Sequence, residues 1–334
     1  MKTTDLQQNS GTSINRKFSV APMLDWTDRH CRFFLRLMSR HTLLYSEMVT
    51  TGALIYGERH RYLQFNTAEH PLALQLGGSD PAELTDCSKM AEDYGYDEIN
   101  LNVGCPSDRV QSGQFGACLM AEPQRVRDCL GSMQQAVNIP VSVKHRIGID
   151  HDDSYEQLLN FVDIVKQSGI TTFIIHARKA WLDGLSPKEN RDVPPLRYEV
   201  VHDLKKENPD LEIIINGGIN TLDEAAEHLK QVDGVMMGRA IYQNPWLLAD
   251  VDKRFFDADN PVSDQHEVIE LLIPYIEEQL AQGARLNHIS RHLLGLFQGA
   301  PGAKAWRRYI SEHAHQPEAG ADVITTAASM VTRQ

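Results

Sequence analysis

The sequence predicts an α/β protein consisting of a (β/α)8 TIM barrel and a small all-helical domain after it. Two observations support this fold class. Eight short, nearly continuous apolar runs recur between residues 18 and 241, as expected for strands buried on both faces of a parallel sheet. Amphipathic helical patterns separate these runs, and no strand pattern follows residue 262. Repeated strand–helix alternation fits a closed barrel, and a doubly wound open sheet is the alternative.

The expected strands are rich in aliphatic residues. They cover residues 18–24 (FSVAPML), 42–49 (TLLYSEMV), 71–78 (PLALQLGG), 98–104 (EINLNVG), 141–148 (VSVKHRIG), 171–178 (TTFIIHAR), 212–219 (EIIINGGI) and 234–241 (GVMMGRAI). Among the intervening helices, Pro81 at a first helical position and Gly95 after the last turn delimit one. Apolar residues at helical spacing mark another at 154–169, and Thr221 with Glu224 predicts a capping box at the start of a third.

The chain is expected to divide into three parts. Residues 1–16 are polar and predict a flexible N-terminal tail, and residues 17–256 form the barrel. The polar segment DADNPVS (257–263) links the barrel to a helical domain at 262–334. A chain of 334 residues suits a large domain with a smaller one, because single cores rarely grow beyond about 300 residues. The C-terminal helices are expected at 263–283, 284–299 and 302–314.

Composition excludes several classes of protein. No apolar run reaches the ~18 residues of a membrane span, and the polar N-terminus resembles no signal peptide, so a cytoplasmic protein without a membrane partner is expected. The five cysteines are scattered and form no CxxC pair, which argues against a disulfide framework and a metal site. A net charge of −12 argues against a DNA-binding protein, although net charge can hide a local basic patch.

In a barrel, functional residues lie at the carboxyl ends of the strands. The last two strands end in Asn216-Gly217-Gly218 and in Gly238-Arg239. Glycine lets backbone N–H groups approach a phosphate, and arginine adds a charge-assisted contact, so these residues predict a phosphate site. The alternative is a pair of tight left-handed turns without a ligand.

Three other expected strands carry polar side chains at or near their ends. Lys144 lies in an apolar strand and should either hold an anionic cofactor or pair with an acid such as Glu47 or Asp25. Gln75 offers a donor and an acceptor to an amide-bearing ring. His176 and Arg178 are two residues apart on one strand and share a face, which favours anion binding, although His176 alone could be a core residue.

Cys105 follows a strand directly, between Gly104 and Pro106. A free thiol has a pKa of about 8.5, so at neutral pH it is available as a proton donor, or as a nucleophile if a base assists. Asn102, three residues earlier, could hydrogen-bond the amide edge of a substrate. The alternative interpretation is a structural cysteine in a turn.

Two basic segments could contact a polyanion. The stretch 285–308 contains no Asp or Glu and carries Arg285, Arg291, Lys304, Arg307 and Arg308. Trp306 within it and the adjacent Tyr309 could stack on bases but are expected to pack in the core. The long loop 179–197 carries Lys188 and Arg191 on the active-site side of the barrel, where the alternative is a solvated loop.

The segment NLNVGCPSDRVQSGQFGA (100–117) resembles the signature of the tRNA-dihydrouridine synthases, in which Asn-x-Gly-Cys-Pro is followed by Gly-Ala. The similarity extends over APMLDWTD, LQLGG, VKHRIG, NGGI, GVMMGRA and the helical tail. HARKAWLDGLSPKENRDVPPLRY and QGAPGAKAWRRYISE are most similar to the A subgroup of the family.

The resemblance implies an FMN-binding barrel, a helical tRNA-recognition domain, and reduction of uridines 20 and 20a in the D-loop of tRNA. FMN reduced by NADPH would pass hydride to C6 of uracil, and Cys105 would protonate C5. Asn102 would position the uracil, and tRNA would contact Arg178, Lys188, Arg191, Lys304, Arg307 and Arg308. The cofactor would contact Pro22, Met23, Leu24, Gln75, Lys144, His176, Asn216, Gly217, Gly218, Gly238 and Arg239.

Two other functions remain possible at this point. A small-molecule pyrimidine or ene reductase using FMN would share the barrel and Cys105 but would not need the basic stretch 285–308. A non-catalytic RNA-binding protein would need neither flavin nor the thiol. The protein is expected to be a monomer.

Overall fold

The computed structural model describes residues 14–333, apart from the side chain of Arg109. Eight parallel strands form one sheet in the order β1-β8-β7-β6-β5-β4-β3-β2. They are β1 (Phe18–Val20), β2 (Leu44–Thr50), β3 (Leu72–Gly77), β4 (Glu98–Val103), β5 (Val141–Arg146), β6 (Thr172–His176), β7 (Glu212–Asn216) and β8 (Gly234–Met237). Seven lie within the predicted runs, and β2 extends one residue past its run, to Thr50.

The sheet closes on itself. A parallel bridge joins Ser19 to Leu43, immediately before β2, and so connects the two end strands of the sheet. The amide of Val20 donates to the carbonyl of Leu43 at 3.0 Å, and the amide of Leu43 donates to that of Phe18 at 3.2 Å. A doubly wound sheet would leave both of these edges free, so the predicted barrel is confirmed.

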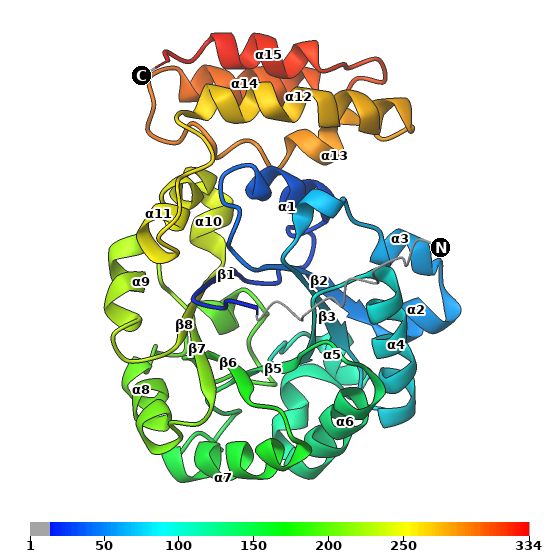
Figure 1. Cartoon of the computed structure of the whole chain (residues 1–334), viewed down its shortest axis with the longest axis vertical. Helices are drawn as coiled ribbons and strands as arrows, with labels where there is room; N and C mark the ends of the chain where they lie inside the picture. The colour runs from blue at the N-terminus through cyan, green and yellow to red at the C-terminus, as the bar shows by residue number, and fades with distance from the viewer. Residues whose placement is uncertain (1–13, 334) are drawn as a thin grey trace, which may run out of the picture.

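Helices surround the barrel as an outer ring (Figure 1). They are α1 (Arg29–Arg36), α2 (Thr51–Tyr56), α3 (Arg59–Leu63), α4 (Pro81–Tyr94), α5 (Asp108–Ser112), α6 (Pro123–Ala136), α7 (Tyr155–Val165), α8 (Tyr198–Glu207), α9 (Leu222–His228), α10 (Arg239–Gln243) and α11 (Val251–Phe255). The predicted end of α4 is confirmed, because Gly95 has φ 93°, a left-handed C-cap conformation. Thr221 caps α9 as predicted, but Glu224 accepts from the amide of Asn220 rather than that of Thr221, so the expected capping box does not form.

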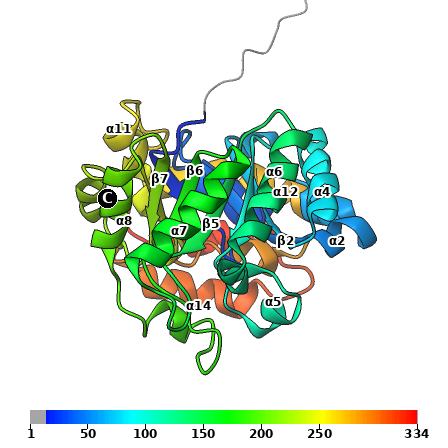
Figure 2. The ribbon, with the colours of Figure 1, turned by 90° about the horizontal axis from the view of Figure 1, so that it is seen from below.

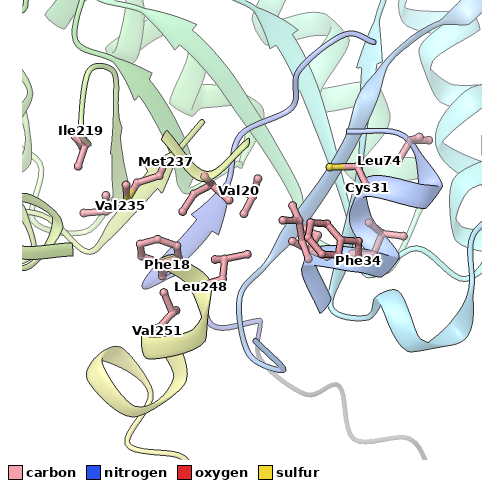
Figure 3. Close-up of a cluster of buried hydrophobic side chains, with 14 of the residues drawn as sticks. Phe18, Val20, Cys31, Phe34, Leu74, Ile219, Val235, Met237, Leu248 and Val251 are labelled. Carbon is pink, nitrogen blue, oxygen red and sulfur yellow. The ribbon is translucent and has the colours of Figure 1, made fainter. Parts of the chain in front are cut away.

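The main core fills the space between the strands and the outer helices. Figure 3 shows Phe18, Val235 and Met237 of two neighbouring strands beside Leu248 and Val251. Phe18 also stacks on Phe255 of α11, with ring centroids 5.4 Å apart. Burial of each such side chain stabilises the folded state by about 1.5–3 kcal/mol. The apolar outward face of each strand therefore holds the helix that covers it.

The amino-terminal end of the barrel interior is charged. Arg16 is buried and donates to Glu98 at 2.7 Å and to Glu212 at 3.0 Å. Burial alone would lower the pKa of Arg16, but the two carboxylates raise it above its ordinary value. Arg16 was placed in the predicted tail at 1–16, whereas it packs inside the barrel; residues 1–13 lie outside the described residues.

Four helices follow the barrel: α12 (Gln265–Ala281), α13 (Leu286–Ser290), α14 (Ala303–His313) and α15 (Asp322–Ser329). They form a layer at one edge of the barrel (Figure 1). The helix expected at 284–299 is wrong beyond α13, where the chain turns repeatedly. A close approach explains this, because a Cβ at Gly295 would lie 2.3 Å from the carbonyl oxygen of Gln243. The sequence analysis also missed α15.

Contacts with α1 hold these helices against the barrel. Asp28 caps α1 and also accepts from Arg291 at 2.6 Å. His292 lies 3.0 Å from the same carboxylate. Phe33 stacks on Tyr275 of α12, with centroids 3.8 Å apart. Arg291, counted above in the basic stretch, is therefore used within the protein.

The expectation for Trp306 is confirmed. Its side chain is fully buried, lies edge-on to Phe297, and donates its indole N–H to the carbonyl of Leu293. Tyr309 is only partly buried and stacks on His313. No helix within residues 14–333 is long and apolar enough to cross a membrane.

Candidate active site

The predicted site residues converge at the carboxyl end of the barrel, and hydrogen bonds join several of them directly. Lys144 Nζ of β5 donates to Asn216 Oδ1 of β7 at 3.0 Å. Asn102 Nδ2 of β4 donates to Gln75 Oε1 of β3 at 2.8 Å. His176 is the register partner of Asn216. Side chains that are separated by up to 141 positions therefore form one cluster.

The backbone around Cys105 is held from several directions. Asn102 Oδ1 accepts from the amides of Gly104 at 3.1 Å and of Cys105 at 3.0 Å. Arg146 Nε donates to the carbonyl of Gly104 at 2.9 Å. Gly116 has φ 76°, and a Cβ there would lie 2.6 Å from the carbonyl oxygen of Cys105, so this position requires glycine. The thiol itself is half-buried, 3.6 Å from the hydroxyl of Ser107.

The other four thiols have different surroundings. Cys31, Cys87 and Cys129 are buried in the core. Burial raises the pKa of Cys87 and of Cys129 to about 12 and raises that of Cys31 well above its ordinary value. Cys118 is half-buried, burial raises its pKa as well, and its thiol lies 3.1 Å from the carbonyl oxygen of Phe115. These four are suited to packing, and Cys105 is the thiol that lies beside Lys144 and Arg146.

The site has an excess of positive charge. Burial, together with the neighbouring Arg146, lowers the pKa of Lys144 to about 7. Burial also lowers the pKa of Arg146 to about 10. The pKa of His176 lies well below its ordinary value, because of burial and then of Arg146 and Lys144. Burial and mutual repulsion disfavour the charged forms of these groups. A bound anion would stabilise those charged forms.

The alternative partners for Lys144 are not used. Among the residues that the structure describes, no carboxylate lies within ion-pair distance of Lys144 Nζ. Glu47 instead accepts from the backbone amide of Asp25. A buried lysine with only an amide oxygen as partner fits an anionic cofactor better than a structural ion pair.

The two predicted glycine turns differ in their requirements. Gly217 and Gly218 have φ 117° and 66°, and a Cβ at Gly217 would lie 2.5 Å from the ring of His176. Their left-handed conformation therefore requires glycine with or without a ligand, as the alternative interpretation held. Gly238 has φ −121°, and a Cβ there would lie 3.4 Å from Ala21, an ordinary contact. At Gly238 the missing side chain leaves space beside β1, which suits a bound group.

Arg239 lies near both turns but is already engaged. Its Nη1 donates to Asp192 Oδ1 at 2.8 Å, and its Nη2 donates to the carbonyl of Arg191 at 3.3 Å. Arg178 donates to the carbonyls of Asp192 and Pro194. Arg239 and Arg178 thus hold the loop 179–197 over the barrel mouth. Pro22, Met23 and Leu24 follow β1 at the same end, with Leu24 63% exposed.

The predicted polyanion contacts lie on two separate elements. Lys188 and Arg191 are exposed on the loop that follows β6. Lys304, Arg307 and Arg308 are exposed on α14, where Arg308 pairs with Glu312 at 3.6 Å. Figure 2 shows α14 on the same side of the molecule as α5, which follows the Cys105 loop. The structure thus brings α14, which carries these exposed cations, to the side of the molecule that carries the Cys105 loop.

Sequence reasoning missed Arg146 and the polar side chains beneath the site, above all Asn100 and Ser142. Arg146 could have been found, because it follows Lys144 by two residues on one strand and therefore shares its face. Asn100 and Ser142 carry the same signal, because they precede Asn102 and Lys144 by two residues on their strands. The structure shows that they are buried and hydrogen-bonded to each other at 2.8 Å.

Comparison with known proteins places this geometry in context. The profile of the family described as dihydrouridine synthase (Dus) matches residues 19–332. A tRNA-dihydrouridine(20/20a) synthase of Shewanella oneidensis is 60% identical over 96% of this chain and 95% of its own. Proteins of the same name from Yersinia pestis and Escherichia coli K12 are 61% and 57% identical, over 95% and 99% of this chain and 92% and 96% of theirs.

The barrel also resembles a solved structure of different sequence. A 2-naphthoyl-CoA reductase in complex with 2-naphthoyl-CoA superposes with a TM-score of 0.54 at 12% identity. The superposition covers 71% of this chain and 50% of that protein. At this identity the similarity concerns the fold alone.

Proposed function

This chain belongs to the dihydrouridine synthase family, and we propose that it is a tRNA-dihydrouridine(20/20a) synthase that uses FMN and NADPH. The observation that carries the proposal is the Cys105 thiol, held beside a buried lysine that has no carboxylate partner among residues 14–333. This arrangement suits an anionic redox cofactor next to a proton donor. The likeness to the (20/20a) synthases over almost the whole chain supports the choice of substrate.

The cofactor would be held mainly by groups that are already oriented. Lys144 and His176 would gain an anionic partner, which would stabilise their charged forms and raise their lowered pKa values. The open space at Gly238, with Arg239 nearby, would take the phosphate. The remaining contacts would come from Pro22, Met23, Leu24, Gln75, Asn216, Gly217 and Gly218.

Reduced FMN, replenished by NADPH, would supply the hydride to C6 of the uracil. The protein would then have to deliver a proton to C5, where negative charge develops. The Cys105 thiol is the donor, because the amide of Asn102 and the guanidinium of Arg146 fix its backbone at the barrel mouth. Asn102 would also orient the uracil ring.

The tRNA would be bound by the catalytic barrel (17–256) and the helical domain (262–334) together. Lys188, Arg191 and Arg178 would contact it from the loop above the barrel, and Lys304, Arg307 and Arg308 from α14. Flipping a base out of its stack costs a few kcal/mol and costs least in a loop, which favours a D-loop uridine. We propose a monomer acting in the cytoplasm.

Nucleoside mass spectrometry tests the proposed reaction. Purified protein with NADPH is incubated with tRNA from cells lacking this gene, and the modified position is mapped. New dihydrouridine at positions 20 and 20a is the expected result. Bound flavin and NADPH oxidation without dihydrouridine, together with reduction of a free pyrimidine or enone, would instead support the small-molecule reductase.

The α14 cluster, defined as Lys304, Arg307 and Arg308, should control the salt dependence of tRNA binding. Replacing all three with glutamine should weaken binding and reduce the slope of log affinity against log salt by about two to three, since each phosphate contact contributes about 0.7–0.9. A matched control replaces with glutamine three exposed lysines on the outside of the barrel, which changes the net charge equally: Lys89 of α4, Lys206 of α8 and Lys230 in the turn after α9. The slope of log affinity against log salt is measured by filter binding. If it is equal for the two triple variants, the tRNA does not bind against the α14 cluster.

A further inference from the structure

A continuous row of hydrogen bonds crosses the barrel interior from its amino-terminal end to Cys105. The Ser142 hydroxyl donates to Glu98 Oε1. Asn100 Nδ2 donates to Ser142 Oγ at 2.8 Å, and Gln75 Nε2 donates to Asn100 Oδ1 at 2.8 Å. Asn102 Nδ2 donates to Gln75 Oε1, also at 2.8 Å. The members come from the adjacent strands β3, β4 and β5, and Glu98, Asn100 and Asn102 are alternate residues of one strand, so all three point inward.

The lower end of this row can only accept hydrogen bonds. Glu98 is fully buried, and one of its oxygens accepts from Arg16 at 2.7 Å. The other accepts from Tyr45 at 2.9 Å and from Ser142. Because Ser142 gives its single proton to Glu98, its oxygen must accept from the next residue, which must present an N–H group. Asn100 is therefore oriented with Nδ2 toward Ser142.

The upper end of the row imposes the same direction. Two backbone N–H groups, of Gly104 and Cys105, require an acceptor, so Asn102 presents Oδ1 to them and turns Nδ2 toward Gln75. Gln75 then accepts through Oε1 and donates through Nε2 to Asn100. The orientations required from the two ends agree at Asn100. Reversing any one amide would place two donors or two acceptors face to face.

We propose that Glu98, Ser142 and Asn100 are positioning residues for Cys105, acting through Gln75 and Asn102. All donors in the row point toward the Glu98 carboxylate, so the bonds polarise one another and strengthen the hold of Asn102 on the Cys105 backbone. Glu98, Asn100 and Ser142 are 0% exposed and Gln75 is 1% exposed, so water does not compete for these groups. The Cys105 backbone is thereby fixed by a carboxylate at the opposite end of the barrel.

Thr172 provides a matched control. It is the register partner of Ser142 on the neighbouring strand β6. Its hydroxyl donates to Glu212 Oε2 at 2.8 Å, and Glu212 also pairs with Arg16. Thr172→Val and Ser142→Ala each remove one buried hydroxyl from the same charged layer, but only Ser142 belongs to the row that reaches Cys105.

Hydrogen exchange of the full chain measures directly how firmly the Cys105 backbone is held. The exchange is followed by mass spectrometry on peptides covering 102–107. Ser142→Ala should raise the exchange rate of the Gly104 and Cys105 amides severalfold, and Asn100→Leu, which is closer to the loop, should raise it more. Thr172→Val should leave it at the wild-type rate even if its melting temperature falls equally. Equal exchange rates of the Gly104 and Cys105 amides in all three variants would overturn the proposal. The proposal would also fail if the exchange rate of each variant rose only in proportion to its loss of melting temperature.

The kinetic readout rests on the proposed function and is kept separate from exchange. In the flavin-loaded enzyme, Asn100→Leu should lower kcat for dihydrouridine formation about tenfold, the effect of one lost hydrogen bond in the transition state, with an unchanged KM for tRNA. Thr172→Val should leave both constants unchanged. If the wild-type protein forms no dihydrouridine, the proposed function is rejected. The hydrogen-exchange result then decides by itself whether these residues position Cys105. A kcat for Asn100→Leu equal to that of Thr172→Val would contradict the coupling to catalysis.

Discussion

Replacing Cys105 with alanine should leave a folded protein that keeps its flavin but forms dihydrouridine about 100- to 10,000-fold more slowly, the usual contribution of a general acid. The side chain lies at the mouth of the barrel, and its removal opens no cavity in the core. Its backbone is held by Asn102 and Arg146, whose contacts to the peptide groups do not involve the thiol. The loss should therefore fall on kcat rather than on folding or on tRNA binding.

The measurement is the single-turnover rate of dihydrouridine formation after reduction of the enzyme by NADPH. Cys118→Ala is the matched control, because Cys118 is also half-buried and lies in the segment that follows the Cys105 loop, but bonds to the carbonyl of Phe115. It should retain the wild-type rate. If Cys105→Ala forms dihydrouridine at the wild-type rate, another group donates the proton to C5 of the uracil.

Replacing Lys144 with methionine should weaken FMN binding by about 10- to 100-fold at pH 7, the contribution of one charge-assisted hydrogen bond. Methionine has a similar length and flexibility, so the core around β5 should stay filled. Lys166→Met is the control, since Lys166 lies on the outside of the barrel and pairs with Asp163. Its FMN affinity should equal that of the wild type.

The pH dependence of FMN binding gives a second, independent test of the Lys144 assignment. Burial lowers the pKa of Lys144 to about 7 in the cofactor-free protein, and a bound anion would raise it by favouring the charged form. Above pH 7, binding would therefore take up a proton, and affinity should fall by up to about tenfold per pH unit until the pKa of the bound state is reached.

Titration of the cofactor-free protein with FMN, followed by flavin fluorescence between pH 7 and 9, measures this slope. Below pH 7, Lys144 is charged in both states and contributes no slope. Lys144→Met should show a flat profile over the same window. A wild-type profile as flat as that of the variant would show that the cofactor does not bind against Lys144.

Much of the fold follows from local patterns. Each of the eight strands coincides with a predicted run to within one residue at most beyond its end, because strands buried on both faces are unbroken aliphatic segments that few other elements resemble. Helix ends were also predictable where one residue decides them, as at Gly95 with φ 93°. The helix expected at 284–299 failed because Gly295 must lie against the carbonyl of Gln243, a contact 52 positions away.

The candidate site was predictable residue by residue but not as an arrangement. Cys105, Lys144 and Asn216 follow or end strands, and strand ends of a parallel barrel meet at one face, so their convergence could be expected. Their partners could not. Lys144 bonds to Asn216 rather than to Glu47 or Asp25, and Arg239 pairs with Asp192, because side-chain pairing depends on positions in space that distant loops determine.

By itself, the sequence determined the barrel, the approximate positions of its strands and the thiol at the end of β4, since periodicity and turn residues act over a few positions. Only the tertiary structure decided which polar groups share the barrel interior. There, Asn100 and Ser142 connect the Glu98 carboxylate to the Cys105 backbone, and Arg16 joins two acids 114 residues apart. Buried polar groups must each find a partner, and closing the barrel is what brings those partners together.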